Sequence, residues 1–359
     1  MKYLIFSLLL IFSFNLFSQT PENLQFNKER IADLTKAIEL DPKNVNAYLN
    51  RGDAKYFLND FKGAITDYSK AIELDPKNVN AYCRGGDAKY ALNDFKGAIT
   101  DCSKAIELDP NRAYAYCLRG VAKYALNDFN GAITDCSKAI ELDPNRAYAY
   151  RSRGDAKHAL KDFRGVITEY SKAIELDPNN SDAYYSRGNA KYALKDFEGA
   201  ITDLSKAIEL DPNKAYTYRS RGIAKHVLKD FRGAITDFSK AIELDPDHDA
   251  YLSRGNAKHA LKDFRGAITD YSKAIELEPK NANAYRSRGS AKYDLKDFSG
   301  AITDFSKALE LDPNNADAYC LRGVAKSQLG DIDGACLDFS KARELGQLSA
   351  YDLIKALCN

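Results

Sequence analysis

The chain has 359 residues, of which 45% are hydrophobic and 29% are charged, and this composition excludes an intrinsically disordered protein. Its formal net charge is +1. Without a surplus of Lys and Arg there is no broad basic surface to release counterions, so no nucleic acid is expected among its partners.

The N-terminal segment differs from everything after it. Lys2 is followed by an apolar run from Tyr3 to Phe17, and Ser18 precedes the polar Gln19. This is the layout of a secretory signal peptide, with cleavage expected after Ser18, and a run of about 15 residues is short for a bilayer-spanning helix. We expect an exported protein, periplasmic or secreted, with no membrane span after cleavage. An uncleaved membrane anchor is the alternative.

Glycine reveals an internal period. One series begins at Gly52 and returns every 34 residues as far as Gly323, with a single step of 33. A second series lies eleven residues after each member, from Gly63 to Gly334, so that all but three of the 21 glycines are periodic. Breakers placed so regularly indicate stacked repeats. We therefore expect one continuous array without a domain boundary.

Each repeat predicts two helices. In the first repeat, Asn44 is suited to cap one helix and Asp60 to cap a second, which should end before Pro76. The second helix carries an apolar stripe over residues 64–72 with helical spacing.

The glycine inside each first helix needs a reason, because it costs about 1 kcal/mol relative to alanine. We expect Gly52 to permit close approach to the small residues Ala64 and Ala71 of the second helix.

One recurring set of residues carries a family resemblance. In the first repeat it consists of Tyr48, Gly52, Ala64, Tyr68, Ala71 and Pro76. Their spacing and types resemble the tetratricopeptide repeat, and similar sets extend the resemblance over residues 22–357. It implies an all-α fold, a right-handed superhelical solenoid of antiparallel helix pairs. The expected parts are a signal peptide (1–18), a degenerate N-terminal half-repeat acting as a cap (19–44), nine tandem repeats (45–346, one of 33 residues) and a C-terminal capping helix (347–359).

The sequence departs from the family at two places in most repeats. The family often has leucine before the repeat glycine and an aromatic residue three positions after it, whereas the first repeat has Arg51 and Lys55. An acid, Asp67 in the first repeat, lies in every second helix. We hypothesise that the basic side chains pack their stems between repeats and pair with these acids.

The resemblance also implies a concave groove lined by the first helices. The groove residues expected to bind a partner are Tyr56, Tyr90, Tyr114, Tyr124, Tyr148, Arg151, Tyr185, Asn189, Tyr192, Tyr216, Arg219, Arg286 and Tyr293. Tyr and Arg are enriched at binding hot spots, which favours an extended peptide or a partner's helix as the ligand. The alternative is that these are ordinary surface residues of duplicated repeats, with no selected ligand.

Nothing in the sequence indicates a catalytic, cofactor or metal centre. His158, His226 and His259 take the groove place where most repeats have tyrosine, and stacked helices lie too far apart for the three to share one ion. The seven cysteines lack metal-ligand spacing, so mostly free thiols are expected, with a bridge near the C-terminus left open.

The sequence supports two functional hypotheses. The first is a non-enzymatic exported scaffold that binds another protein or an extended peptide through its groove. The alternative is a structural protein of the cell envelope that self-associates and has no selected groove ligand.

Overall fold

The computed structural model describes residues 20–358, so the predicted signal peptide (1–18) lies outside the described residues. Within residues 20–358 the regular structure is entirely α-helical, and the helices follow one another in packed pairs. The predicted all-α repeat fold is confirmed.

The helices have these bounds. The first helix of the described chain is α2 (Pro21–Leu40), and the last is α21 (Ser349–Leu357). The first helices of the pairs are α3 (Val45–Phe57), α5 (Val79–Ala91), α7 (Ala113–Ala125), α9 (Ala147–Ala159), α11 (Ser181–Ala193), α13 (Ala215–Val227), α15 (His248–Ala260), α17 (Ala282–Asp294) and α19 (Ala316–Gln328). The second helices are α4 (Phe61–Leu74), α6 (Phe95–Leu108), α8 (Phe129–Leu142), α10 (Phe163–Leu176), α12 (Phe197–Leu210), α14 (Phe231–Leu244), α16 (Phe264–Leu277), α18 (Phe298–Leu311) and α20 (Ile332–Glu344).

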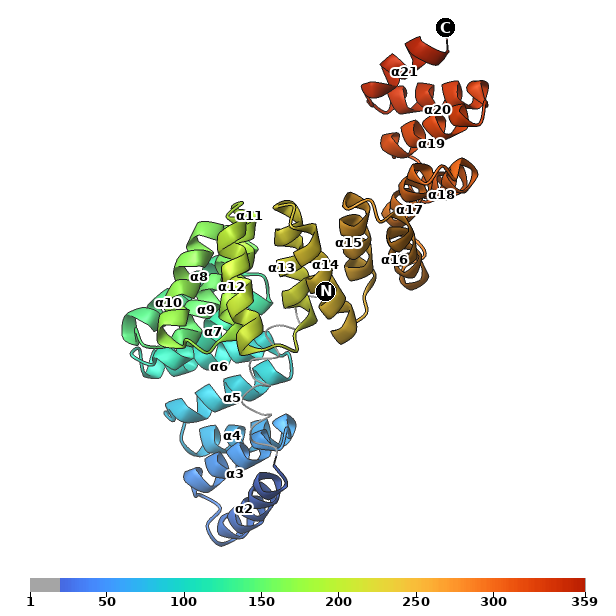
Figure 1. The fold of residues 1–359 in the computed structure, drawn as a ribbon. Coiled ribbons are helices and arrows are strands. Elements are labelled where there is room, and N and C mark those ends of the chain that lie inside the picture. The colour runs from blue at the N-terminus through green and yellow to red at the C-terminus, as the bar shows by residue number, and fades with distance from the viewer. Residues whose placement is uncertain (1–19, 359) are drawn as a thin grey trace. The chain divides into compact units, whose positions relative to one another are not determined.

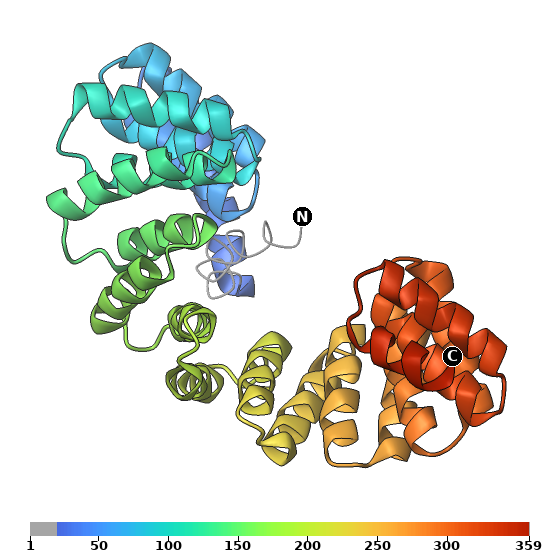
Figure 2. The ribbon, with the colours of Figure 1, turned by 90° about the horizontal axis from the view of Figure 1, so that it is seen from above.

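The described chain falls into two compact units, residues 20–179 and 180–358. Inside each unit, a second helix packs on the first helix of its own pair and on that of the next pair (Figure 1). Figure 2 presents the same order of helices by colour from above. The turn at 177–180 has the same length as most other turns, so the sequence does not mark a division there.

The helix boundaries obey the predicted signals. The Asn44 side chain accepts a hydrogen bond from the Ala47 N–H at 3.0 Å, and the Asp60 carboxylate accepts one from the Gly63 N–H at 2.9 Å. Helix α4 ends at Leu74, just before the Asp-Pro step at Pro76. Side-chain caps thus satisfy amide groups that would otherwise lack acceptors at the helix starts.

The repeat glycine has a different neighbour from the one expected. A Cβ atom added at Gly52 would lie 2.5 Å from the Tyr68 ring, and one at Gly222 would lie 2.8 Å from the Phe238 ring. Close approach of the helices is confirmed, and the alanine equivalent to Ala64 is a near neighbour in some repeats, as Ala132 is to Gly120 at 3.2 Å, but at Gly52 itself the Tyr68 ring is nearest. The large side chain in the middle of the second helix lies against the glycine and takes up the space.

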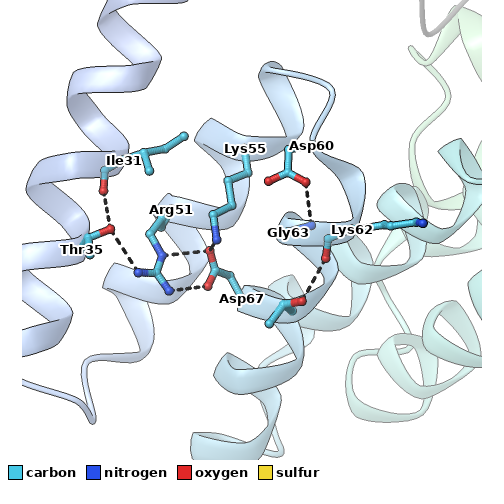
Figure 3. A network of polar contacts seen from close by, with 9 residues as sticks. Ile31, Thr35, Arg51, Lys55, Asp60, Lys62, Gly63 and Asp67 are labelled. Carbon is cyan, nitrogen blue, oxygen red and sulfur yellow. Dashed lines mark hydrogen bonds and ion pairs between the residues drawn. The ribbon is translucent and has the colours of Figure 1, made fainter.

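The basic residues beside the glycine form a buried polar network (Figure 3). Arg51 donates from Nε and Nη2 to the two Asp67 oxygens at 3.0 and 2.6 Å, and Lys55 Nζ lies 2.8 Å from Asp67 Oδ2. Arg51 Nη1 also donates to the Thr35 hydroxyl of the preceding helix α2, at 3.2 Å. The hypothesis that these cations pair with the acids is confirmed, and the pairs lie within one repeat.

The same network recurs along the chain. Bidentate pairs join Arg119 to Asp135, Arg187 to Asp203, Arg221 to Asp237, Arg254 to Asp270, Arg288 to Asp304 and Arg322 to Asp338. Each guanidinium also lies over the ring of the tyrosine three residues before it, as Arg119 does over Tyr116 at 5.5 Å. Because paired carboxylates such as Asp135 are buried, this arrangement compensates the cost of taking the charge out of water.

The cysteines divide into two groups. Cys336 on α20 and Cys358, the residue after α21, form a disulfide that ties the last helix to the preceding pair. Cys83, Cys102, Cys117 and Cys136 are buried free thiols, and Cys320 is a half-buried one. The bridge near the C-terminus, left open by the sequence, is therefore present.

Of the helices formed by residues 20–358, not one combines the length and the apolar character that a bilayer span requires.

Candidate binding surface

The first helices form a continuous surface inside each unit. In the first unit α3 contacts α5, α5 contacts α7 and α7 contacts α9, and in the second unit α11 to α19 do the same. The predicted groove residues all lie on these first helices, so neighbouring members are brought together by direct helix contact.

A cavity of about 210 Å³ opens beside α3 and α5 in the first unit. Its lining consists of Asp53, Tyr56, Phe57, Tyr68, Arg84 and Asp87. Three aromatic side chains therefore stand beside two carboxylates and one guanidinium. The formal charge of the lining is −1, and the volume suits one amino-acid side chain rather than a large ligand.

The polar groups of this cavity are fixed by hydrogen bonds. Arg84 Nη1 lies 2.8 Å from Asp53 Oδ2, and the Tyr68 hydroxyl donates to Asp53 Oδ1 at 2.9 Å. The Tyr114 hydroxyl of α7 donates to Asp87 at 2.5 Å. Because α4, α5 and α7 each supply a partner, the carboxylates are held in place before any ligand arrives.

Comparison of the repeats explains why Asp87 accepts its hydrogen bond from a tyrosine of another repeat. The core tyrosine of the first repeat, Tyr68, bonds to Asp53 of its own repeat, and Tyr271 bonds in the same way to Asn256 at 2.9 Å. In the second repeat this core position is Cys102, which is fully buried and has no hydroxyl to offer. Asp87 therefore takes its donor from the next repeat along the chain.

Burial raises the pKa of both carboxyl groups. The pKa of Asp53 is raised by burial, against the opposing effects of Arg84 and the Tyr68 hydroxyl. Burial raises the pKa of Asp87 to about 7, although the Tyr114 hydrogen bond and Arg84 both act to lower it. Asp87 can thus lose or gain a proton near neutral pH, when a ligand changes the local charge.

Most predicted groove tyrosines share a packing role. Their rings lie at 5.1–5.5 Å, edge-on or tilted, from the phenylalanine that opens the next helix, which adds an aromatic contact to each helix turn. These pairs are Tyr56–Phe61, Tyr90–Phe95, Tyr124–Phe129, Tyr192–Phe197 and Tyr293–Phe298. Of this group, Tyr56 also lines the cavity.

The other predicted residues of the first unit lie on α7 and α9. Tyr114 is half-buried beside Asp87, and Tyr148 is 36% exposed. Arg151 is only 8% exposed, and its Nε is a buried donor without an acceptor among the described residues.

In the second unit the predicted residues engage one another and nearby acids. Tyr185 and Tyr216 make an edge contact at 4.7 Å, and the Tyr216 hydroxyl donates to Asp182 at 3.2 Å. Arg219 donates from Nη1 to Asp247 at 3.0 Å and to Asp249 at 3.2 Å.

Asn189 on α11 and Arg286 on α17 complete the predicted set in this unit, and both are half-buried. Whether any predicted groove residue of the second unit binds a partner stays a prediction.

Sequence reasoning missed Asp53, Arg84 and Asp87. A signal was available at Arg84, because the second repeat reads "RGG" at 84–86 where the fourth to eighth repeats have "SRG". A departure from an otherwise strict pattern is where a site is best sought. Among the described residues, no group of three or more His, Cys, Asp or Glu side chains is arranged to hold a metal ion.

Comparison with known proteins identifies the family. The model described as TPR repeat matches residues 52–84, 86–127, 154–195, 255–296 and 289–330, which is more than half of the chain. The model described as tetratricopeptide repeat matches residues 113–146 and 181–214. The chain belongs to the tetratricopeptide repeat family. Repeats of this kind serve as protein-interaction scaffolds and are generally non-catalytic.

Solved structures agree on the fold of this tetratricopeptide repeat protein. A tetratricopeptide repeat protein from Parabacteroides merdae is 18% identical, with a TM-score of 0.51 over 69% of this chain and 99% of that chain. The APC/C hetero-tetramer Cut9–Hcn1 gives 15% identity and a TM-score of 0.51, over 91% of this chain and 81% of that one.

The MamA protein is 30% identical, with a TM-score of 0.45, and covers 48% of this chain and 94% of its own. No curated protein matches the sequence.

Proposed function

We propose that this tetratricopeptide repeat protein is an exported scaffold that binds an extended peptide along the first helices α3 to α9. The observation that carries the proposal is the cavity between Asp53 and Asp87, which has aromatic walls and fixed charges. Pockets with an apolar lining and a few convergent polar groups are the usual place for a side chain that anchors a ligand. In this arrangement one peptide side chain enters the cavity.

Two neighbouring groups support the same surface. Tyr148 exposes a ring of the type enriched at binding hot spots, and Arg151 Nε is a buried donor without an internal acceptor, which in this proposal donates to a peptide carbonyl oxygen. Both lie on α9, so a peptide that begins at the cavity passes α7 and reaches them. Of the other predicted groove residues, Tyr90, Tyr114 and Tyr124 lie on the intervening helices α5 and α7.

The binding proposal is tested with a peptide selected from a random-peptide library on the purified protein. Tyr56→Ala should weaken its binding at least tenfold in calorimetric titration, because Tyr56 lines the cavity. Tyr293→Ala is the matched control, since Tyr293 makes the same ring contact with its phenylalanine but lies in the other unit. Equal effects of the two substitutions, or none from either, would argue against the cavity.

Export is inferred from two features. The first is the signal-peptide layout of residues 1–18, and the second is the disulfide between Cys336 and Cys358, a bond that persists mainly in oxidising compartments. N-terminal sequencing of the protein purified from its source should begin at Gln19. A sequence beginning at Met1 in a membrane fraction would favour the uncleaved anchor instead.

Self-association is a second candidate function. Large apolar side chains are exposed near both ends of the described chain, with Phe26 60% exposed on α2, and Leu348 and Tyr351 77% and 55% exposed at α21. Such side chains suit contact with another copy. Light scattering at micromolar concentration separates the two functions, since a monomer favours the peptide scaffold and a concentration-dependent mass favours assembly.

A further inference from the structure

A guanidinium-binding arrangement recurs between the repeats. In the third repeat, Arg119 donates to both Asp135 oxygens at 2.9 and 2.7 Å and to the Ser103 hydroxyl at 3.2 Å. The guanidinium lies over the Tyr116 ring, and Lys123 shares the same carboxylate at 2.8 Å. The partners stand at fixed offsets from the arginine. The carboxylate lies sixteen residues after it, the hydroxyl sixteen before it, the tyrosine ring three before it and the lysine four after it.

The second repeat has every partner of this arrangement but not the arginine. Residue 85, the arginine position, is glycine. The same offsets give Asp101, Ser69, Tyr82 and Lys89, which are the carboxylate, hydroxyl, ring and ammonium found elsewhere. Arg84, the residue before Gly85, does not replace the missing group, because its Nη1 lies at Asp53 in the cavity.

The carboxylate of this repeat is left short of donors. Asp101 is 7% exposed, and its Oδ2 is a buried oxygen without a hydrogen-bond donor. Lys89 Nζ lies 2.7 Å from Asp101 Oδ2, an ion pair that the other repeats also have, so the guanidinium is what this repeat lacks. Asp101 Oδ2 also lies 3.0 Å from the point where a Cβ atom of residue 85 would stand, so it faces the place of the missing side chain.

The same place is slightly more exposed than its counterparts in the neighbouring repeats. The side chain of Asp101 is 10% exposed, against 4% for Asp135 and 2% for Asp67, which keep their arginines. Ser69 is exposed, whereas Ser103, its counterpart beside Arg119, is half-buried. The approach to the carboxylate is therefore from the side of the exposed Ser69 hydroxyl.

We propose that Asp101, Ser69 and Tyr82 form a binding site for the guanidinium group of an arginine side chain from a partner polypeptide. The planar group would take the position that arginine fills in the neighbouring repeats, with a bidentate carboxylate, a hydroxyl acceptor and an aromatic face. A lysine ammonium lacks the planar fork that binds a carboxylate through two parallel hydrogen bonds. This site uses none of the cavity-lining residues, so the inference stands apart from the proposed peptide groove.

The first experiment measures the melting temperature in 0–20 mM guanidinium at constant ionic strength, with sodium as the reference salt. Between 0 and 20 mM guanidinium, the melting temperature of the wild type should rise by about 2 °C more than that of Gly85→Arg, which supplies the guanidinium from the chain itself. The reason is that a ligand that binds only the folded state stabilises it. Arg119→Gly, which creates a second site of the same kind, should gain more than the wild type. Identical curves for the wild type and Gly85→Arg would overturn the proposal, as would no gain for Arg119→Gly.

The second experiment identifies the ligand by calorimetric titration with N-acetyl-arginine amide, free arginine and N-acetyl-lysine amide. The capped arginine should bind the wild type at least tenfold more tightly than the capped lysine, and Asp101→Asn should abolish the difference. If Gly85→Arg does not fold, Asp101→Asn replaces it as the reference variant that lacks the site. Binding of free arginine without binding of the capped form would overturn the assignment to a polypeptide, and so would equal binding of the lysine compound.

Discussion

At the scale of single residues, the acid of the fourth repeat shows how closely the buried network depends on side-chain length. Glu169 stands where the other described repeats have aspartate. Arg153 donates from Nη2 to Glu169 at 2.8 Å and from Nη1 to Ser137 at 3.0 Å, but its Nε is buried without an acceptor. The guanidinium therefore bonds the longer Glu169 carboxylate through Nη2 alone, and the second, parallel hydrogen bond from Nε is lost.

Glu169→Asp should restore the second bond. We expect a gain of about 1 kcal/mol, the usual net contribution of a buried hydrogen bond, seen as a higher melting temperature by circular dichroism. Asp203→Glu is the reciprocal control, because Arg187 now makes both bonds with Asp203 at 2.9 and 2.7 Å. It should lower the melting temperature, and a change of the same sign in both variants would contradict the explanation.

Asp87 makes stability depend on pH near neutrality. Its carboxyl group ionises near pH 4 in the unfolded chain, whereas burial raises its pKa to about 7 in the folded protein. Between these values the folded state holds a proton that the unfolded state has lost, so the contribution of Asp87 falls as pH rises through this window. Asp87→Asn should therefore melt several degrees above the wild type at pH 8. The difference should vanish near pH 4, and a constant difference would show that ionisation is not its cause.

At the scale of helices, the turn between the two helices of each repeat adopts a left-handed backbone. Its central residue has a φ of 62° at Asn59 and 65° at Lys195, while the last repeat has Gly330 with a φ of 82°. Asparagine tolerates this region better than lysine, and glycine tolerates it best.

Lys195→Gly should consequently raise the stability of the second unit by about 0.5 kcal/mol, after part of the relief is offset by the greater freedom of glycine in the unfolded chain. Gly330→Lys makes the reverse change at the same place in the last repeat and should destabilise the protein. Melting temperatures of the two variants check the sign. A loss in Lys195→Gly would mean that unfolded-state entropy outweighs strain.

The helix pairs were predictable because their signals are local. Asn44, Asp60 and Pro76 act within a few residues of their own helix ends, and the recurrence of one pattern removes the ambiguity of any single copy. The pairing of Arg51 with Asp67 was predictable for a related reason, since opposite charges kept at a constant offset in many repeats must meet.

The cavity was not predictable in this way. Its position depends on how far Tyr68 reaches and on Cys102 being too short to bond Asp87, and both are properties of packed side chains. The contact between Gly52 and the Tyr68 ring also depends on how the side chain packs, and the sequence predicted alanines at that place instead.

At the scale of the whole molecule, helix pairs are joined to the pair before them by the equivalent arginine, except in the second repeat, where the position is Gly85. Arg288 of α17 bonds bidentately to Asp304 of its own pair and donates to Ser272 of α16 at 3.0 Å. Stability in a repeat array is carried by such neighbour contacts, so removing one should uncouple the helix pairs on its C-terminal side from those before it.

Arg288→Ala should increase amide hydrogen exchange in helices α17 to α21 of the second unit more than in α11 to α14. Asp304 keeps its ion pair with Lys292, but the loss of two hydrogen bonds to this buried carboxylate should cost about 2 kcal/mol. Lys273→Ala is the control, because Lys273 pairs with Glu276 on the solvent-exposed side of α16. It should leave both exchange and melting unchanged, and uniform exchange along the unit in Arg288→Ala would contradict the coupling.

The backward reach of the arginine also gives the array a direction of growth. Arg51 contacts Thr35, sixteen residues nearer the N-terminus, and Arg322 contacts Ser306 at the same offset. A chain that leaves a ribosome or a translocation pore N-terminus first thus presents each hydroxyl before the guanidinium that will bind it. Every new pair emerges onto a completed neighbour, and α21, fastened by Cys358, is the last element to close.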